Sequence, residues 1–223
     1  MTSPTSQLGG GYSESNPDPG PTVEAVLAAA TAGAPSSHLV ILAGPPGVGK
    51  STVSSGLLEL LPGTFCVDKD VTASGFILEA AASAGLPSSE AYGTKRYWRE
   101  LRPREYAGAV GLACANLVGT RIVLAVGGWG PELGVERLWI GLEERVAPAR
   151  LTVIHLDPPE LERWRQRMAA RGSRTDSPWF EHFCEAVTAA AVWSGAVHVP
   201  TGGPLNQVVE DVLAVLTPIG ATT

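Results

Sequence analysis

The chain has 223 residues, a length that suits one domain with a buried core or a core plus a small insertion. Hydrophobic residues make up 44% of it and charged residues 17%, as in an ordinary globular protein. The formal net charge of −6 disfavours broad attraction to a phosphate backbone, so we expect no nucleic-acid partner. No apolar stretch approaches the ~18 residues of a membrane span and no signal peptide is apparent, so we expect a cytoplasmic protein without a membrane partner.

The two ends of the chain are predicted to be tails. Residues 1 to about 20 are rich in Ser, Gly, Pro and Asn, and such a segment cannot offset its ordering entropy by burial. We therefore expect a flexible N-terminal tail over 1–37, with a short helix over 22–32 that has Thr22 as its N-cap. Residues 218–223 are expected to form a C-terminal tail, which leaves 38–217 as one domain.

Short apolar strands alternate with helical stretches through this domain. The strands are predicted at 39–43, 64–67, 121–126, 151–156 and 196–199. The helices are predicted at 50–61, 71–84, 105–118, 131–146, 159–170, 178–194 and 205–216. Continuous apolar strands separated by helices indicate a five-stranded parallel sheet covered on both faces, a three-layer α/β domain.

A phosphate-binding loop is predicted at 44–51, where the chain reads G-P-P-G-V-G-K-S and matches the pattern G-x-x-x-x-G-K-[ST]. The loop follows an apolar strand and precedes a helix, which is the context that the motif requires. Its glycines let successive N–H groups face one anion, and the helix N-terminus adds positive charge. The predicted nucleotide-binding residues of this loop are Gly44, Gly47, Val48, Gly49, Lys50, Ser51 and Thr52. We expect Lys50 to reach the β- and γ-phosphates and Ser51 to ligate Mg²⁺.

Two aspartates follow the second predicted strand. Asp68 and Asp70 stand at its carboxyl end, the edge at which open α/β sheets bind ligands. They could divide two tasks, holding Mg²⁺ and accepting a proton from an attacking hydroxyl, or they could lie in a solvated turn. Asp68 is nearer the strand end and is favoured as metal ligand and base, with Asp70 as the alternative base.

Arginines recur every four residues in the segment 163–177, which we expect to form a helical lid. Arg163, Arg167 and Arg171 would share one helix face, and their repulsion is unfavourable unless an anion joins them. A lid over ATP supplies that anion, so Arg163 and Arg167 are predicted to bind nucleotide, and Arg167 and Arg171 to act in catalysis. The alternative is a solvated basic face paired with Glu160 and Glu162.

The third predicted strand is followed by a glycine pair and no acid. Val126 leads into Gly127, Gly128 and Trp129, and the first carboxylate is Glu132. Many NTPases carry a metal-binding acid here, so its absence favours a phosphotransferase over a motor ATPase. Gly127 and Gly128 would let backbone N–H groups approach a substrate.

A basic and aromatic stretch lies between the second and third strands, in the region of about 71–118. Cations alternate there with aromatic residues, a mixture that can hold an anionic or sugar-like ligand. From this stretch we select Arg99 and Arg102 as candidate substrate-binding residues.

These motifs resemble the small P-loop kinases of the nucleoside-monophosphate-kinase-like superfamily. The Asp68/Asp70 and Gly127/Gly128 patterns look like those of shikimate kinase. The arginine segment is similar to that of bacterial AAA-domain kinase-like proteins, and chloramphenicol phosphotransferases are relatives of the same build. The resemblance implies a sheet of order 2-3-1-4-5 and ATP with Mg²⁺. It also implies adenine contacts from the lid and the loop that begins at Thr201, and an acceptor site in the region of about 71–118. The shikimate kinase pattern has a third glycine where this chain has Trp129, so the resemblance implies that Trp129 projects into the acceptor pocket.

Together, these features predict an ATP-dependent phosphotransferase that moves the γ-phosphoryl group to a hydroxyl of a small molecule, such as an antibiotic or other specialised metabolite. Two alternatives stay open. One is a nucleotide-dependent regulatory ATPase, and the other is a toxin-type kinase that acts on a nucleotide sugar.

Overall fold

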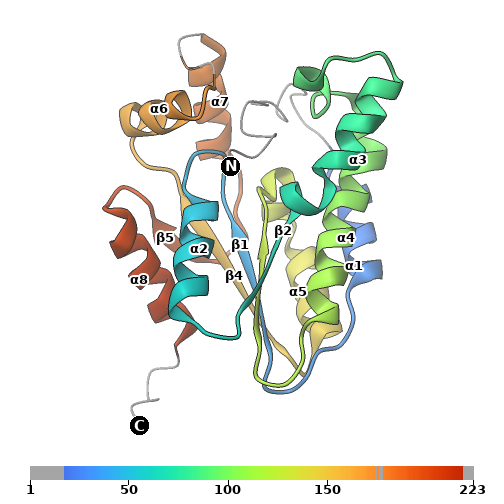
Figure 1. The fold of residues 1–223 in the computed structure, drawn as a ribbon, viewed down its shortest axis with the longest axis vertical. Helices are drawn as coiled ribbons and strands as arrows, with labels where there is room; N and C mark the ends of the chain where they lie inside the picture. Colours follow the sequence, from blue (N-terminus) through green and yellow to red (C-terminus); the bar gives the residue numbers. More distant parts are fainter. Residues whose placement is uncertain (1–17, 174, 176–177, 218–223) are drawn as a thin grey trace.

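The computed structural model describes residues 18–173, 175 and 178–217, and it contains the predicted five-stranded parallel sheet (Figure 1). Its strands are β1 (His38–Ala43), β2 (Phe65–Asp68), β3 (Ile122–Val126), β4 (Arg150–Asp157) and β5 (Val197–Pro200). They lie in the order β2-β3-β1-β4-β5, so the expected order is confirmed. In the centre of the sheet, Ile41 of β1 pairs with Ala125 of β3 and with Val153 of β4.

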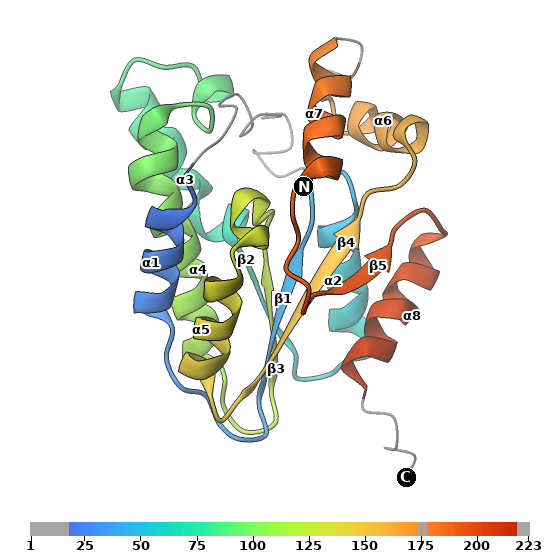
Figure 2. The same cartoon turned by 180° about the vertical axis from the view of Figure 1, so that it is seen from behind.

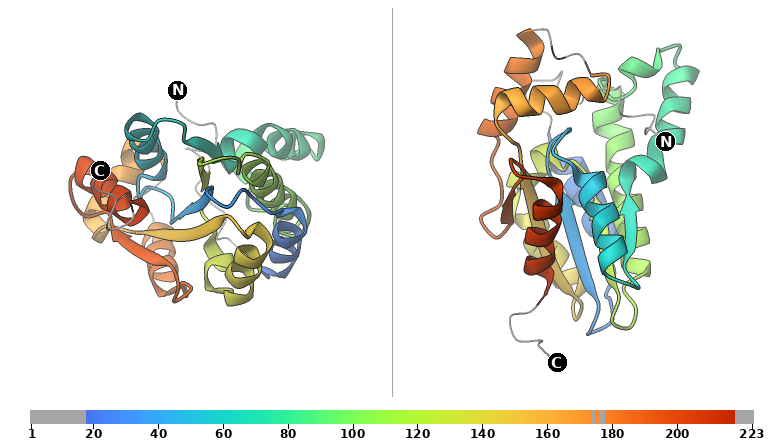
Figure 3. Two further views of the ribbon diagram at one scale, coloured as in Figure 1. Left: turned by 90° about the horizontal axis from the view of Figure 1, so that it is seen from below. Right: turned by 60° about the vertical axis from the view of Figure 1, so that its left-hand side comes forward.

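Helices cover both faces of the sheet, which gives the three predicted layers (Figures 2 and 3). One face carries α2 (Lys50–Leu60) and α8 (Leu205–Leu216), and the other carries α1 (Gly20–Ala29), α4 (Arg102–Ala115) and α5 (Glu136–Val146). Every residue of β1 is buried, because alternate side chains enter the hydrophobic core on one face and then the other.

The predicted N-terminal tail is too long. Helix α1 begins at Gly20, after Pro19 at the cap position, so Thr22 lies inside the helix rather than at its N-cap. Val23 and Val26 are fully buried in the core beside α4, which makes α1 part of the folded domain. Short apolar residues spaced three apart gave too weak a signal to distinguish this packed helix from a loose one.

Two helical groups stand above the carboxyl ends of the strands, on opposite sides of the sheet edge (Figure 1). One contains α3 (Lys69–Ser83), the 3₁₀ turn η2 (Ser88–Glu90) and the π-helical turn η3 (Tyr97–Leu101), with a hydrophobic cluster of their own. The other contains α6 (Leu161–Ala170) and α7 (Pro178–Ala189), again with a separate cluster. Each group is therefore packed around a small cluster separate from the two clusters that cover the sheet.

Most predicted helices and strands are present, and their bounds differ by a few residues. The predicted helix over 131–146 is divided into a 3₁₀ turn, η4 (Gly130–Gly134), and α5, because Val135 adopts an extended conformation between them. Among the described residues, no helix has both the length and the apolar composition that crossing a bilayer requires.

Candidate functional site

The loop between β1 and α2 curls through three glycines with positive φ. Gly44, Gly47 and Gly49 have φ of 143°, 83° and 101°, a region that favours glycine. A Cβ at Gly44 would lie 2.7 Å from the Leu156 carbonyl oxygen, so a larger residue would displace the backbone. The first turn of α2 has neither a side-chain cap nor an acidic residue, which leaves its N–H groups available to an anion. The local geometry therefore suits a phosphate group.

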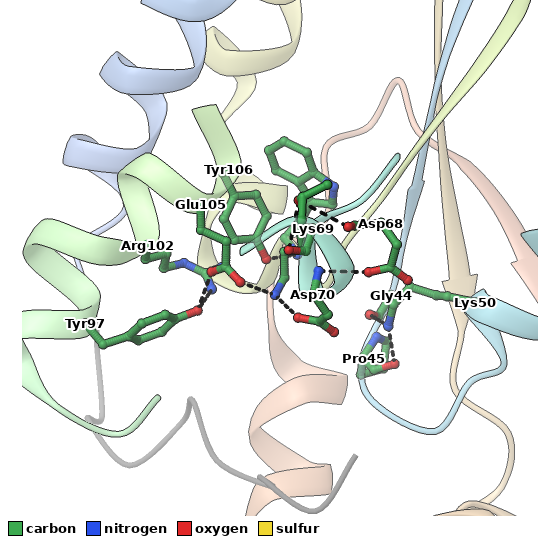
Figure 4. Close-up of polar contacts among 12 residues, drawn as sticks. Gly44, Pro45, Lys50, Asp68, Lys69, Asp70, Tyr97, Arg102, Glu105 and Tyr106 are labelled. Atoms are coloured by element: carbon green, nitrogen blue, oxygen red, sulfur yellow. Dashed lines mark hydrogen bonds and ion pairs between the residues drawn. The ribbon is translucent and has the colours of Figure 1, made fainter. Parts of the chain in front are cut away.

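Lys50, the first residue of α2, folds back over this loop. Its Nζ donates hydrogen bonds to the carbonyl oxygens of Gly44 (2.6 Å) and Pro45 (2.9 Å), as Figure 4 shows. Burial lowers the pKa of Lys50 to about 8, opposed by Asp70 and assisted by the positive charges of Lys69 and Arg171. The charged form of Lys50 is therefore destabilised in this site, and a bound anion would stabilise it.

A cavity of about 580 Å³ extends from this loop across the carboxyl ends of the strands. What we call its loop half is lined by residues 46–52 and by Arg167 and Arg171. Its aromatic half is lined by Lys69, Tyr92, Tyr97, Trp98, Arg102 and Tyr106. Asp68, Asp70, Gly127 and Gly128 also line the cavity. The predicted phosphate loop, aspartate pair and glycine pair thus meet in one space.

The two aspartates have different surroundings. Asp68 ends β2 and caps α3, because its Oδ1 accepts a hydrogen bond from the Asp70 N–H at 2.9 Å. Burial, together with the charge of Asp70, raises the pKa of the Asp68 carboxyl above its ordinary value. Asp70 instead pairs with Lys69 at 2.5 Å. A carboxylate with a raised pKa at a cavity wall is suited to accept a proton.

Lys69 is the centre of a buried polar network that the sequence did not reveal (Figure 4). Its Nζ donates to Asp70 Oδ1 and, at 2.9 Å, to Glu105 Oε1 of α4. The second oxygen of Glu105 accepts a hydrogen bond from the Tyr97 hydroxyl at 2.8 Å. Burial acts to lower the pKa of Lys69, but Glu105 and its other neighbours outweigh it and raise this pKa well above the ordinary value. The network therefore holds an ammonium at the floor of the aromatic half.

Arg102 lines the cavity as predicted, but its charge is already neutralised. Its Nε and Nη2 donate to the two carboxylate oxygens of Glu132 at 2.9 and 2.6 Å, and both side chains are almost fully buried. The guanidinium also stacks on the rings of Trp98 and Tyr106, at 4.5 and 4.4 Å from their centroids. Glu132, the first acid after β3, is thus committed to Arg102 and does not line the cavity.

The segment predicted as a lid packs directly on the phosphate loop. Trp164 of α6 donates from Nε1 to the Pro46 carbonyl oxygen at 2.8 Å. A Cβ at Gly47 would lie 2.7 Å from the Met168 sulfur, so this glycine also permits the close approach of α6. The predicted lid includes Arg174 and Asp176, which lie outside the described residues.

The arginines of α6 lie on two different faces of the helix. Arg163 donates to the Gly202 carbonyl oxygen, and Arg167 donates to the Thr201 carbonyl oxygen at 2.9 Å. Arg165, on another face, forms the ion pairs with Glu162 and Glu181. Within the described residues, no acidic side chain forms a salt bridge with Arg163, Arg167 or Arg171, which disfavours the alternative of a paired basic face.

Two candidate substrate-binding residues do not face the cavity. Arg99 is exposed on the outer side of η3 and is not part of the cavity wall, because the π-helical turn directs Tyr97 and Trp98 inward instead. Trp129 is only 2% exposed and packs in the core against Tyr106 and Trp139. Its left-handed backbone (φ 58°) turns the indole away from the cavity, so the expectation that it projects into the pocket is wrong.

Three further candidates act beside the cavity rather than on its wall. Gly44 shapes the loop, Thr201 is buried under Arg167, and Arg163 holds the adjoining loop from outside. Thr201 is anchored through its hydroxyl, which donates to the Asp157 carbonyl oxygen at 2.7 Å. These contacts connect α6 to the loop after β5, where the family resemblance implies adenine contacts.

A second polar cluster lies at the ends of β4 and β5. Asp157 Oδ1 accepts from the Nδ1 atoms of His155 (2.7 Å) and His198 (2.8 Å). One ligand atom from each residue lies within 4.8 Å of the others, a spacing that could hold a cation. The sequence did not show this grouping, because strand pairing brings His155 and His198 together from 43 positions apart.

The cavity wall offers oxygen ligands for Mg²⁺. Asp68 and Asp70 supply its carboxylates and Ser51 supplies a hydroxyl, whereas Glu132 is occupied by Arg102. Mg²⁺ prefers such hard oxygen donors together with substrate phosphates, so these residues fit the ion that the loop motif implies.

Solved structures of other proteins have a similar fold. A gluconokinase from Sinorhizobium meliloti aligns with a TM-score of 0.52 and 20% identity over 80% of this chain and 91% of that chain. A tunicamycin resistance protein from Deinococcus radiodurans aligns with a TM-score of 0.55 and 17% identity over 81% of this chain and 95% of that chain. The chain therefore has the fold of the small P-loop kinases. No protein-family model matches it, and no curated protein matches it either.

Proposed function

We propose that this protein is an ATP-dependent phosphotransferase that moves the γ-phosphoryl group to a hydroxyl of a small molecule. The observation that carries the proposal is the cavity of about 580 Å³, which joins the phosphate loop to an aromatic half. Asp68 and Asp70 line it between β2 and α3. A nucleotide on the loop and a second molecule in the aromatic half would share this space. The kinase fold supports the same conclusion.

In the proposed reaction, a hydroxyl oxygen of the acceptor attacks the γ-phosphorus. The new P–O bond forms as the bond between the γ-phosphorus and the β,γ-bridging oxygen breaks, and ADP leaves. The hydroxyl proton passes to Asp68, whose raised pKa brings it closer to neutral pH than an ordinary aspartate. Asp70 is the alternative base, although its ion pair with Lys69 makes it a weaker proton acceptor.

The remaining candidates hold the phosphates in this proposal. Lys50 neutralises the β- and γ-phosphates, and the N–H groups of the glycine loop bind their oxygens. Ser51 would ligate Mg²⁺ and Asp68 would hold it through a bound water, which leaves the carboxylate open to the proton; the ion, when bound, would neutralise phosphate charge. Arg167 and Arg171 extend from α6 over the same half of the cavity and stabilise negative charge on the transferring group.

The adenine would lie between α6 and the loop that begins at Thr201. Arg163 and Arg167 already hold that loop through its carbonyl oxygens. The acceptor would be an antibiotic or other specialised metabolite. The support for this choice is that a protein of similar fold is named for tunicamycin resistance.

The test is a screen for ATP-dependent phosphate addition across a library of hydroxylated metabolites and antibiotics, read by mass spectrometry. A product that gains one phosphoryl group, with one ADP released for each product, supports the proposal. Rapid ATP hydrolysis that no acceptor changes and that a protein partner stimulates contradicts it and favours a regulatory ATPase. Growth arrest on expression, with phosphate transfer confined to nucleotide sugars, favours the toxin-type kinase.

A further inference from the structure

The aromatic half of the cavity contains two positive side chains, and each of them is already in an ion pair with a carboxylate. Lys69 is bonded to Glu105 at 2.9 Å and to Asp70 at 2.5 Å. Arg102 holds both oxygens of Glu132. An incoming carboxylate or phosphate would have to compete with these carboxylates for the two cations, and any pair it displaced would leave an uncompensated buried carboxylate.

Each cation of this half already faces carboxylates. Lys69 lies between Asp70 and Glu105, and Arg102 lies on Glu132. A negative group on the acceptor would meet these carboxylates in a site of low dielectric, where repulsion between like charges is strong. The electrostatics therefore disfavour the anionic ligand that the arginine-rich sequence suggested.

The walls are aromatic and contain two polar atoms without a partner. Tyr92 packs edge to face on Tyr97, with ring centroids 4.9 Å apart, and Tyr97 does the same on Trp98 at 5.6 Å. Within the described part of the chain, the buried Tyr92 hydroxyl and Trp98 Nε1 make no hydrogen bond. Buried polar atoms are normally paired, and an indole N–H can only donate. Because both atoms are covered in this conformation, a ligand oxygen would accept a hydrogen bond from the indole N–H only where the wall opens to admit the ligand.

This wall depends on the π-helical turn η3. The N–H of Arg102 bonds to the Tyr97 carbonyl oxygen five residues earlier, so the turn is wider than an α-helical one. Adjacent residues Tyr97 and Trp98 are consequently both buried at the cavity, and Arg102 follows on the same side. Such turns are rare inside helices and are frequent at functional sites.

We infer that the acceptor is an uncharged, hydroxylated molecule with a flat apolar face. Its ring would lie against Tyr92, Tyr97 and Trp98, and its ether, carbonyl or hydroxyl oxygens would accept hydrogen bonds from Trp98 and Tyr92. This inference rests on the proposed phosphotransfer and narrows it, because sugars and cyclic polyols that carry a carboxylate or phosphate are excluded as preferred substrates.

The experiment compares pairs of compounds that differ only in charge. 4-Nitrophenyl β-glucoside is tested against the corresponding glucuronide, and uridine against uridine 5′-monophosphate, with transfer from ATP followed by mass spectrometry. We expect kcat/KM at least about tenfold higher for the uncharged member. Equal or greater transfer to the charged members overturns the inference and leaves the proposed function intact. A metabolite screen that yields only carboxylate- or phosphate-bearing acceptors also overturns the inference, whereas a screen with ATP bound and no phosphate transfer to any compound overturns the proposed function itself.

Two variants test the residues that make the prediction. W98F removes the indole N–H and Y92F removes the hydroxyl, and each keeps an aromatic ring in place. We expect each to raise KM for the uncharged acceptor about five- to tenfold while KM for ATP stays unchanged. W193F is the matched control, because Trp193 stacks on Trp139 in the core, outside the cavity. An unchanged acceptor KM in both W98F and Y92F contradicts the assignment.

A third variant tests the electrostatic argument directly. E132Q keeps the shape of the Arg102 partner but removes its charge, so Arg102 becomes available to an anion. We expect the preference for the glucoside over the glucuronide to shrink by about tenfold. A merely structural role would lower the melting temperature without changing this ratio. If E132Q does not fold, W98F and Y92F still decide the question.

Discussion

The two halves of the cavity are built in different ways. The loop half comes from one contiguous stretch, in which the three glycines, Lys50 and Ser51 follow each other between β1 and α2. The aromatic half comes from residues that tertiary contacts bring together, such as Lys69 with Glu105 and Arg102 with Glu132. The loop half is built from a curled backbone and the first turn of α2, whereas the aromatic half neutralises its own charges in pairs.

This difference has a chemical meaning. A triphosphate is the same in every enzyme that uses it, so a local and repeatable structure can bind it. An acceptor differs from one enzyme to another, and its recognition depends on a particular arrangement of side chains. The experiments below ask whether the two halves are as separate in function as they are in construction.

The largest effect is expected between the two halves, at the aspartates. Asp68→Asn should lower kcat about 10²- to 10⁴-fold while the affinity for ATP survives, because the hydroxyl proton loses its acceptor. Asp70→Asn should cost less and should mainly disturb Lys69, its ion-pair partner. The measurement is steady-state phosphate transfer together with ATP binding by calorimetry. Unchanged turnover in both variants would exclude this pair from catalysis.

In the loop half, Lys50→Ala should lower kcat about 10²- to 10³-fold, because a preorganised charge at the phosphates is lost. The affinity for the acceptor should change little if the halves are separate. Acceptor binding, measured by titration in the absence of ATP, checks this point. A large loss of acceptor affinity in K50A would show that the halves are coupled.

In the aromatic half, Glu132→Ala should mainly affect stability. It leaves the Arg102 guanidinium buried without its carboxylate, and breaking a buried pair in this way costs about 3–5 kcal/mol of unfolding free energy. Urea unfolding of the variant measures this cost. Arg99→Ala is the control, since Arg99 is exposed one helical turn before Arg102. Its loss should change the free energy of unfolding by less than about 0.5 kcal/mol. Equal stability of E132A and R99A would contradict the importance of the buried pair.

The loop half should also respond to pH on the alkaline side. Burial lowers the pKa of Lys50 to about 8, so its charge is present below that pH and is lost as the pH rises through it. The affinity of the free protein for ATP should therefore weaken by up to about tenfold between pH of about 8 and 9. Lys50→Arg keeps its charge over this range, and its affinity should be flat. A flat profile for the unmodified protein would be inconsistent with the lowered pKa.

The smallest effect is expected on the outside of the site. Arg99→Ala should change KM for the acceptor by less than about twofold, because the side chain is exposed and does not line the cavity. Kinetics with any acceptor found in the screen test this. A marked rise in KM would restore Arg99 to the site and would show that η3 changes shape when the acceptor binds.

The sequence by itself determined the parts of this protein that are local. Apolar runs of four to eight residues separated by helical stretches indicated the strands, and the family resemblance added their order. The curled conformation of the loop 44–51 was predictable, because glycines at this spacing permit the positive φ values that the loop adopts. The four-residue repeat also put Arg163 and Arg167 on one face of α6, and in the structure both side chains of that face contact the loop after β5.

Only the tertiary structure decided which charges are paired and which side chains face the cavity. Arg102 and Glu132 are 30 positions apart, so nothing in the local pattern showed that each neutralises the other. Trp129 entered the core because its backbone adopts a left-handed conformation that its residue type does not announce. Tyr97 and Trp98 face inward because a single turn is π-helical. These outcomes depend on contacts between distant segments, and so the aromatic half became visible only in the folded chain.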